Sequence, residues 1–193
     1  MHVQAMDAVA KMIATSGYIP ARGLDPDRLG LDLGGADVNG TARSLFDPAI
    51  TWLGLDIAPG PGVDIVADAR TWRGKVAALE SPRIMMSADL DAGFDVVLCT
   101  ELLEHVRDWH LVLETIDRVL APGGYAFITC AGTDGRTGRR PHGARGELDP
   151  PLGEHYQNVN IERFRRMVER GSWADTQASY NPDPGDIYAW MRK

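Results

Sequence analysis

The fold is decided by residues 94–130, FDVVLCTELLEHVRDWHLVLETIDRVLAPGGYAFITC. A short, nearly continuous apolar run lies at each end, and apolar side chains recur at helical spacing over residues 109–120 between them. Pro122, Gly123 and Gly124 stop this helix, because proline cannot continue a helix and glycine favours the turn that follows one. A strand, a crossover helix and a second strand in this arrangement predict a parallel βαβ unit.

Further elements lie on both sides of this unit. The short apolar runs LGLDLG, TWLGLDI and GVDIVADA come before it, and such runs alternating with helical segments are typical of a parallel sheet covered on both faces. After it, NIERFRRMVERG predicts a helix, and WADTQASYNPDPGDIYAWMRK predicts two strands joined by a turn at residues 181–185. Residues 1–20 predict an amphipathic helix that ends near Ser16 and forms either a lid or a packed helix.

Length and composition limit the possible classes of protein. The chain has 193 residues, so we expect residues 1–193 to form a single domain. A formal net charge of −7 argues against nucleic acid as a partner. The chain lacks an apolar run long enough to span a membrane and begins without the features of a signal peptide, which predicts a cytoplasmic protein without a membrane partner. We expect a monomer or a homodimer. Cys99 and Cys130 lack partners at metal-ligand spacing, so we expect small core residues and no metal site.

Three successive predicted strands each finish with an aspartate, namely Asp32, Asp56 and Asp68. Each has a plain structural explanation, since Asp32 and Asp68 could cap helices and Asp56 could start a turn. In a doubly wound sheet, however, the ligand crevice lies beyond the carboxyl ends of the strands. A carboxylate at the end of the second strand accepts two hydrogen bonds from the vicinal hydroxyls of a ribose. Together the three aspartates favour a nucleotide-cofactor site.

The chain resembles the class I S-adenosylmethionine-dependent methyltransferases, in particular the small-molecule branch that includes the ubiquinone-biosynthesis enzymes. The resemblance covers residues 28–130 and, in outline, the C-terminal pair of strands. Its motifs are LDLGG, LGLDI, ADAR, FDVVLCTELLEHV and LAPGGYAFIT, of which the last two are the most specific. It implies an α/β, doubly wound, Rossmann-like sheet of seven mostly parallel strands, with an antiparallel C-terminal strand and helices on both faces. It also implies transfer of a methyl group from S-adenosylmethionine to an oxygen or nitrogen atom of a small-molecule acceptor.

The resemblance also assigns the cofactor contacts. The residues after the first strand would approach the methionine part of the cofactor, Asp56 would hold the ribose hydroxyls, and Asp68 would face the adenine amine. The end of the fourth strand would line the floor below the sulfonium. The predicted cofactor-binding residues are Asp32, Gly34, Gly35, Ala36, Asn39, Asp56, Ile57, Asp68, Ala69, Cys99 and Thr100.

The loop LDLGGADVNG, residues 31–40, departs from the family pattern. The family has glycines at alternate positions after the acidic residue, whereas Ala36 and Val38 occupy two of these positions here. A valine does not adopt a positive φ without strain, while Asn39 and Gly40 adopt one readily. We therefore expect the tight turn two residues further along, at Asn39 and Gly40.

Methyl transfer needs a general base only where the acceptor is a hydroxyl or a protonated amine. His105, His142 and His155 are candidates, because the unperturbed pKa of histidine lies near neutrality. Glu101 precedes His105 by four residues, so we expect both on one face of the helix after the fourth strand. The plain alternative is that His105 anchors that helix, and Tyr156 is a further candidate. The predicted catalytic residues are His105, His155 and Glu101.

Residues 131–158 are rich in glycine, proline and arginine and show no periodicity, which predicts a long substrate-recognition loop. Arg136, Arg139, Arg140 and Arg145 favour a clamp for a carboxylate or phosphate on the acceptor, because a guanidinium binds such anions through two parallel hydrogen bonds. A solvated basic surface loop explains the same residues equally well.

Two other functions stay open at this point. A glycine loop followed about twenty residues later by an aspartate also fits a nicotinamide-dependent oxidoreductase, although the glycine triplet is incomplete. The third possibility is a non-catalytic binding module that has the fold of a methyltransferase.

Overall fold

The computed structural model describes residues 3–19, 28–37, 40–74, 93–135 and 155–193. The strands are β1 (Leu29–Leu33), β2 (Thr51–Asp56), β3 (Ile65–Val66), β4 (Phe94–Thr100), β5 (Leu120–Thr133), β6 (Val159–Asn160), β7 (Asp175–Asn181) and β8 (Asp186–Arg192). The α-helices are α1 (Val3–Thr15), α2 (His110–Val119) and α3 (Ile161–Val168), and the 3₁₀ helices are η1 (Ala42–Leu45) and η3 (Leu103–His105).

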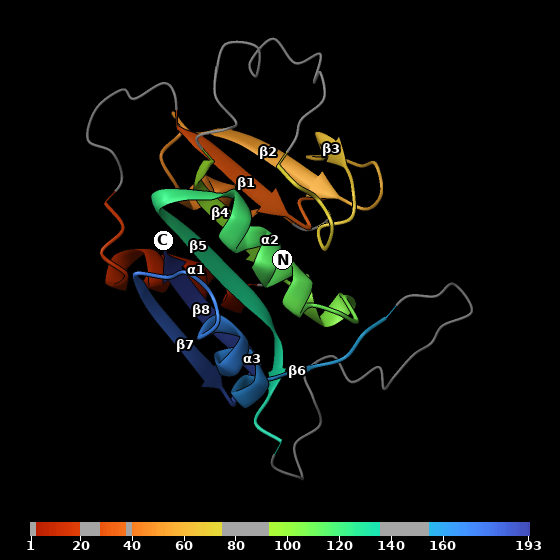
Figure 1. Ribbon diagram of the computed structural model, residues 1–193, viewed down its shortest axis with the longest axis vertical. Helices are drawn as coiled ribbons and strands as arrows, with labels where there is room; N and C mark the ends of the chain where they lie inside the picture. Colours follow the sequence, from red (N-terminus) through yellow and green to blue (C-terminus); the bar gives the residue numbers. More distant parts are fainter. Residues whose placement is uncertain (1–2, 20–27, 38–39, 75–92, 136–154) are drawn as a thin grey trace.

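The strands form one mixed sheet in the order β3-β2-β1-β4-β5-β8-β7, with β6 paired to β5 off this path. All pairs are parallel except those of β8, which runs antiparallel to both β5 and β7. This confirms the predicted fold class. From β1 the chain proceeds outward to β2 and β3, and it then returns to β4 on the other side of β1 (Figure 1). The strand order therefore reverses between β1 and β4.

The central strands are apolar because both of their faces are covered. All five residues of β1 are buried. Along β4, Val97 and Cys99 belong to the core on one face of the sheet, while Val96 and Leu98 belong to the core on the other face. Successive side chains of a strand point to opposite faces, so a two-sided core requires a nearly continuous apolar run.

Helices cover both faces of the sheet. On one face α2 and α3 pack together, and the rings of Trp109 and Phe164 stack with centroids 5.9 Å apart. On the other face Val9 and Met12 of α1 join a separate core; Figure 1 shows α1 and α2 on opposite sides of the sheet. The predicted helices at the N-terminus, at residues 109–120 and before the final strands are confirmed. Among the helices that the structure describes, none has both the length and the apolar character needed to cross a bilayer.

Two predicted strand boundaries differ from the structure. The third strand ends at Val66 rather than at Asp68, because the Asp68 carbonyl accepts the amides of Thr71 and Trp72 and turns the chain. The fifth strand begins earlier than predicted, since Leu120 already pairs with Phe94 before an irregularity in the ladder.

The crossover from β1 to β2 contains no α-helix among its described residues. Its regular part is η1, four residues long. The hydroxyl of Thr41 caps this 3₁₀ helix by accepting a hydrogen bond from the Arg43 amide at 3.2 Å. From η1 the side chain of Arg43 reaches Asp32 of β1.

Candidate active site

A cavity of about 640 Å³ lies at the carboxyl ends of β1 and β2, beside the position at which the strand order reverses. Pockets for small ligands typically measure roughly 300–1,000 Å³. The lining residues are Gly34, Leu55, Asp56, Ile57, Ala67, Asp68, Ala69, Arg70, Leu102, His105, Val106, Arg107 and His155.

This cavity brings together many of the predicted site residues, from segments far apart in the sequence. Those that line it are Gly34, Asp56, Ile57, Asp68, Ala69, His105 and His155. The predicted residues that are described but do not line it are Asp32, Gly35, Ala36, Cys99, Thr100 and Glu101. Asn39, His142 and the four predicted clamp arginines lie outside the described residues.

Asp56 is the last residue of β2 and borders the cavity. Its Oδ1 accepts a hydrogen bond from the Ala58 amide at 3.2 Å, so it also starts the turn that follows. This contact fixes the direction of the carboxylate. The neighbouring Ile57 is 73% exposed, which leaves an apolar side chain at the cavity wall.

Asp68 and Arg70 form an ion pair at the same cavity. The guanidinium donates to both carboxylate oxygens, at 2.6 Å from Nη2 and 3.0 Å from Nε. These hydrogen bonds hold the pKa of Asp68 below its usual range. Asp68 therefore stays ionised with Arg70 beside it. Sequence reasoning missed Arg70, although its position two residues after an aspartate made a local pair possible.

The chain turns directly after β1, at Gly34, whose φ is 76°. The amides of Gly34 and Gly35 both donate to the carbonyl of Leu55, at 2.8 Å and 3.0 Å. Gly40 also has a positive φ, 89°, and its amide donates to Asp37 Oδ1 at 2.9 Å. Gly40 therefore has the positive φ that was predicted, whereas Asn39 lies outside the described residues, and the chain already turns earlier, at Gly34.

Asp32 lies within β1 and not at its end, and its carboxylate is buried. Its Oδ2 accepts hydrogen bonds from Arg43 Nε at 2.9 Å and from the hydroxyl of Thr41 at 3.1 Å. Burial raises the pKa of this carboxyl, and Arg43 and Thr41 oppose the rise. The side chain of Asp32 therefore binds Arg43 and Thr41 and does not line the cavity, and its predicted contact with the cofactor stays a prediction.

The expectation that Glu101 and His105 share a helical face was wrong. Glu101 adopts a positive φ of 56°, and η3 begins two residues later and is a 3₁₀ helix. The two residues therefore do not belong to one helix. Glu101 Oε1 accepts a hydrogen bond from the hydroxyl of Thr129 on β5 at 2.8 Å. His105 lines the cavity, and its ring lies 5.0 Å from that of Tyr156.

Glu104 is a buried carboxyl that sequence reasoning did not assign. Its side chain Oε1 accepts a hydrogen bond from the Ala131 amide at 3.1 Å, and its main-chain carbonyl accepts one from the Gln157 amide at 2.7 Å. It thereby joins η3 to β5 and to the segment that carries His155. Burial, together with the charge of Glu101, raises the pKa of Glu104 from 4.5 to about 8.

This raised pKa makes stability depend on pH in a defined direction. In the unfolded chain the carboxyl ionises above pH 4.5, whereas in the folded protein it keeps its proton up to about pH 8. The unfolded state therefore binds fewer protons in this window, and stability falls as the pH rises. We expect the Tm of the wild type to fall, relative to that of Glu104→Gln, between about pH 5 and about pH 8 in thermal unfolding. Parallel Tm profiles for the two proteins would contradict this assignment.

Both cysteines are fully buried, and burial raises the pKa of each thiol well above its ordinary value. This agrees with the prediction of small core residues. Cys99 is the second-last residue of β4, next to Thr100. Within the described ranges no group of His, Cys, Asp and Glu side chains is arranged to hold a metal ion.

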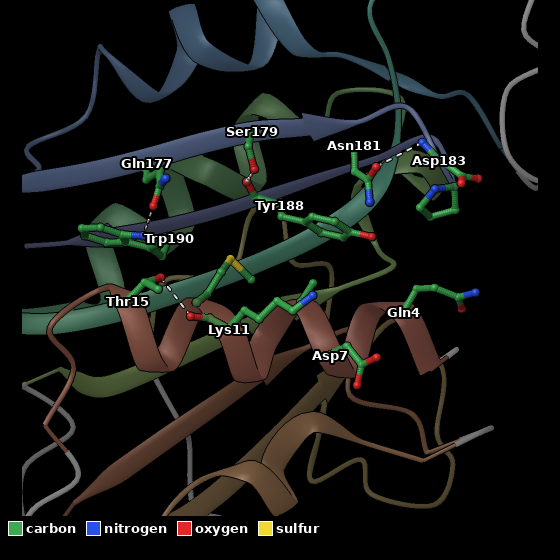
Figure 2. A pocket seen from close by; sticks show the side chains of 13 residues that line it. Gln4, Asp7, Lys11, Thr15, Gln177, Ser179, Asn181, Asp183, Tyr188 and Trp190 are labelled. Atoms are coloured by element: carbon green, nitrogen blue, oxygen red, sulfur yellow. Dashed lines mark hydrogen bonds between the residues drawn. The ribbon is translucent and has the colours of Figure 1, made fainter.

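A second cavity, of about 360 Å³, lies between α1 and the β7–β8 hairpin (Figure 2). Polar groups in its wall bind one another. Trp190 Nε1 donates to Gln177 Oε1 at 2.9 Å, and the hydroxyl of Thr15 donates to the carbonyl of Lys11 at 2.9 Å. None of the predicted site residues that the structure describes lines this cavity. The first cavity is therefore the candidate active site.

A family described as "Methyltransferase domain" matches residues 18–177. The match covers most of the chain, so the chain belongs to this family of methyltransferases. This confirms the class of enzyme that the sequence resemblance predicted.

Similar proteins agree with this membership. The chain is 32% identical over 192 residues to a ubiquinone biosynthesis O-methyltransferase of Xanthomonas oryzae pv. oryzae, in a match that covers 90% of this chain and 70% of the relative. Among solved structures, the fold is similar to that of 1,6-didemethyltoxoflavin-N1-methyltransferase of Burkholderia thailandensis, with bound S-adenosylhomocysteine. That likeness has a TM-score of 0.60 and 19% identity, over 98% of this chain and 78% of that one.

The N-methyltransferase NodS of Bradyrhizobium japonicum, in complex with S-adenosylhomocysteine, has the same fold. Its TM-score is 0.57 at 13% identity, over 98% of this chain and 85% of that one. At these identities the two structures establish a shared fold, and both hold the demethylated form of the predicted cofactor.

Proposed function

We propose that the chain transfers the methyl group of S-adenosylmethionine to an oxygen or nitrogen atom of a small-molecule acceptor. The observation that carries the proposal is the carboxylate of Asp56, which borders a cavity at the switch point of a doubly wound sheet, next to the turn at Gly34. The names of the similar proteins, which include an O-methyltransferase and two N-methyltransferases, support both kinds of acceptor atom.

The residues present fit this cofactor. Asp56 offers carboxylate oxygens to a ribose diol, and the cavity volume of about 640 Å³ suits a ligand of nucleoside size. At Gly34, an added Cβ would lie 3.2 Å from the side chain of Leu102, so glycine leaves room at the cavity wall. Asp68 and the backbone of Ala69 would face the adenine amine.

The cofactor, when bound, supplies an electrophilic methyl group on a sulfonium that is already a good leaving group. The protein then mainly orients the acceptor and excludes water. His105 and His155 both border the cavity, and we assign them the removal of a proton from a hydroxyl or ammonium acceptor. Glu101 directly follows β4 and accepts a hydrogen bond from Thr129 of β5, and it would act with the two histidines on the acceptor side.

An anionic group on the acceptor is the more specific part of the proposal. It is supported by the run of arginines at positions 136, 139, 140 and 145, which the sequence places between β5 and β6. A guanidinium binds a carboxylate or phosphate through two hydrogen bonds, so such a loop would favour acidic acceptors.

The proposal is tested by thermal unfolding of the full chain with S-adenosylhomocysteine, S-adenosylmethionine or NADH. A ligand at about one hundred times its Kd stabilises a protein by about 2.7 kcal/mol, which in a chain of this size raises the Tm by about 5–10 °C. We expect this rise with the two sulfur cofactors and none with NADH. The reverse result would favour an oxidoreductase and overturn the proposal.

Catalysis is then tested by a mass-shift screen of acceptors. Transfer to at least one acceptor is expected, and cofactor binding with no transfer across a broad panel would favour a non-catalytic module. On the acceptor found, His105→Gln and His155→Gln should lower kcat by about tenfold or more, in line with general-base catalysis, while leaving the affinity for S-adenosylhomocysteine nearly unchanged. A kcat unaffected by both substitutions would remove the histidines from the mechanism.

A further inference from the structure

Arg43 joins three segments of the chain at the candidate cofactor site. From η1 its Nε donates to Asp32 Oδ2 at 2.9 Å. Its Nη2 donates to the carbonyl of Gly35 at 3.2 Å and to that of Gly62 at 3.0 Å. One guanidinium therefore connects β1, the loop that follows it, and the turn between β2 and β3.

This guanidinium and its partner are largely buried. The side chain of Arg43 is 16% exposed, and that of Asp32 is 5% exposed. A buried carboxylate is costly unless it is paired and hydrogen-bonded, and the planar guanidinium supplies several donors in fixed directions. A lysine at this position would keep the charge but could not hold three oxygens in the same geometry.

Two glycines leave the space that this guanidinium occupies. A Cβ added to Gly35 would lie 2.8 Å from Arg43 Nη2, and one added to Gly54 would lie 2.5 Å from the same atom. A Cβ at Gly35 would also lie 2.7 Å from the carbonyl oxygen of Asp32 and 2.9 Å from the Cα of Gly54, so both the backbone and Arg43 require a glycine here, although its own φ is not positive.

We propose that Arg43 is a positioning residue, which holds the loop after β1 in the conformation that binds the methionine part of the cofactor. The inference rests on the proposed function. Gly34 borders the cavity, and the carbonyl of its neighbour Gly35 is held by Arg43. Because one peptide bond joins the two glycines, a shift of the Gly35 carbonyl would change the cavity wall at Gly34. A loop fixed before binding spares the ligand the entropic cost of ordering it. Arg43 thus fixes this loop through a side-chain contact to the Gly35 carbonyl.

The experiment compares two ligands on the full chain by isothermal titration calorimetry. S-adenosylhomocysteine contains the amino-acid part of the cofactor, whereas 5′-methylthioadenosine lacks it. We expect Arg43→Lys to lower the affinity for S-adenosylhomocysteine by about tenfold and the affinity for 5′-methylthioadenosine by less than about twofold. Arg43→Gln should lower the affinity for S-adenosylhomocysteine further. The matched control is Arg165→Lys, because Arg165 also binds a carboxylate, on Glu162 at 3.0 Å, and a carbonyl, on Ala178 at 3.2 Å, away from the cavity.

The affinities of Arg43→Lys for the two ligands distinguish a positioning role of Arg43 from a general effect on the fold. Affinity of Arg43→Lys for S-adenosylhomocysteine within about twofold of the wild type would overturn the inference, as would an equal loss for both ligands, which would indicate a general effect on the fold. A wild type that binds neither ligand would overturn the proposed function and this inference with it. Arg43→Lys keeps the pairing charge, so the test stands even if Arg43→Gln does not fold.

Discussion

Asp56→Ala is expected to lower the affinity for S-adenosylhomocysteine by about a hundredfold or more and to remove the rise in Tm that this ligand causes. The reason is that hydrogen bonds to a charged group contribute about 1.5–3 kcal/mol each, and a ribose diol would make two with this carboxylate. A factor of one hundred corresponds to about 2.8 kcal/mol, which such a pair supplies. Calorimetry with the full chain measures the loss directly.

Asp47→Ala is the matched control. Asp47 Oδ1 accepts the Ala49 amide at 2.8 Å, the same two-residue turn contact that Asp56 makes with Ala58, but Asp47 does not line the cavity. The two variants should therefore lose similar amounts of stability and differ only in binding. If Asp56→Ala bound S-adenosylhomocysteine within about threefold of the wild type, the ribose assignment would be wrong.

Gly54→Ala is expected to destabilise the fold by about 3 kcal/mol or more, which lowers the Tm by roughly 10 °C in a domain of this size. Gly54 lies in β2, and a Cβ at this position would lie 1.8 Å from the carbonyl oxygen of Gly62. That oxygen is backbone and accepts a hydrogen bond from Arg43, so it cannot move without breaking the contact. Thermal and urea unfolding both measure the effect.

Gly60→Ala serves as the comparison from the same turn. A Cβ there would meet no atom within 4 Å, and the φ of Gly60 is not positive. We expect a change of less than about 0.5 kcal/mol, as for most exposed substitutions. Equal Tm values for the two variants would show that the turn between β2 and β3 adapts freely, contrary to the packing described.

The sequence predicted the elements whose signal is local. Continuous apolar runs located the strands, because a sheet covered on both faces needs apolar side chains at every position. The 3.6-residue period located α2 and α3, and the turn after Asn181 located the final hairpin. The aspartate at the end of β2 was found for a similar reason, since a polar residue after a buried strand marks the edge of the sheet.

The remaining features depend on contacts between residues distant in the chain. The Arg43 guanidinium reaches Gly62, nineteen residues away, and Glu104 is buried because β5 supplies the Ala131 amide. The hydrophobic periodicity of a sequence does not indicate which distant residues form such pairs. The left-handed conformation of Glu101 was likewise invisible, because glutamate rarely adopts a positive φ and the prediction assumed a regular helix.

The four-residue 3₁₀ helix η1 in the crossover from β1 to β2 bears on how the site tolerates mutation. Where a long helix supports a ligand loop, the support comes from backbone N–H groups, which no substitution other than proline removes. Here the Arg43 side chain adds to the backbone contacts of Gly34 and Gly35, so a single exchange at Arg43 would reduce affinity while the sheet stays intact. Cofactor affinity in this chain can therefore change gradually under selection, and a library that varies Arg43 while keeping Gly35 and Gly54, which the packing of the fold requires, would sample weaker and tighter binders on one scaffold.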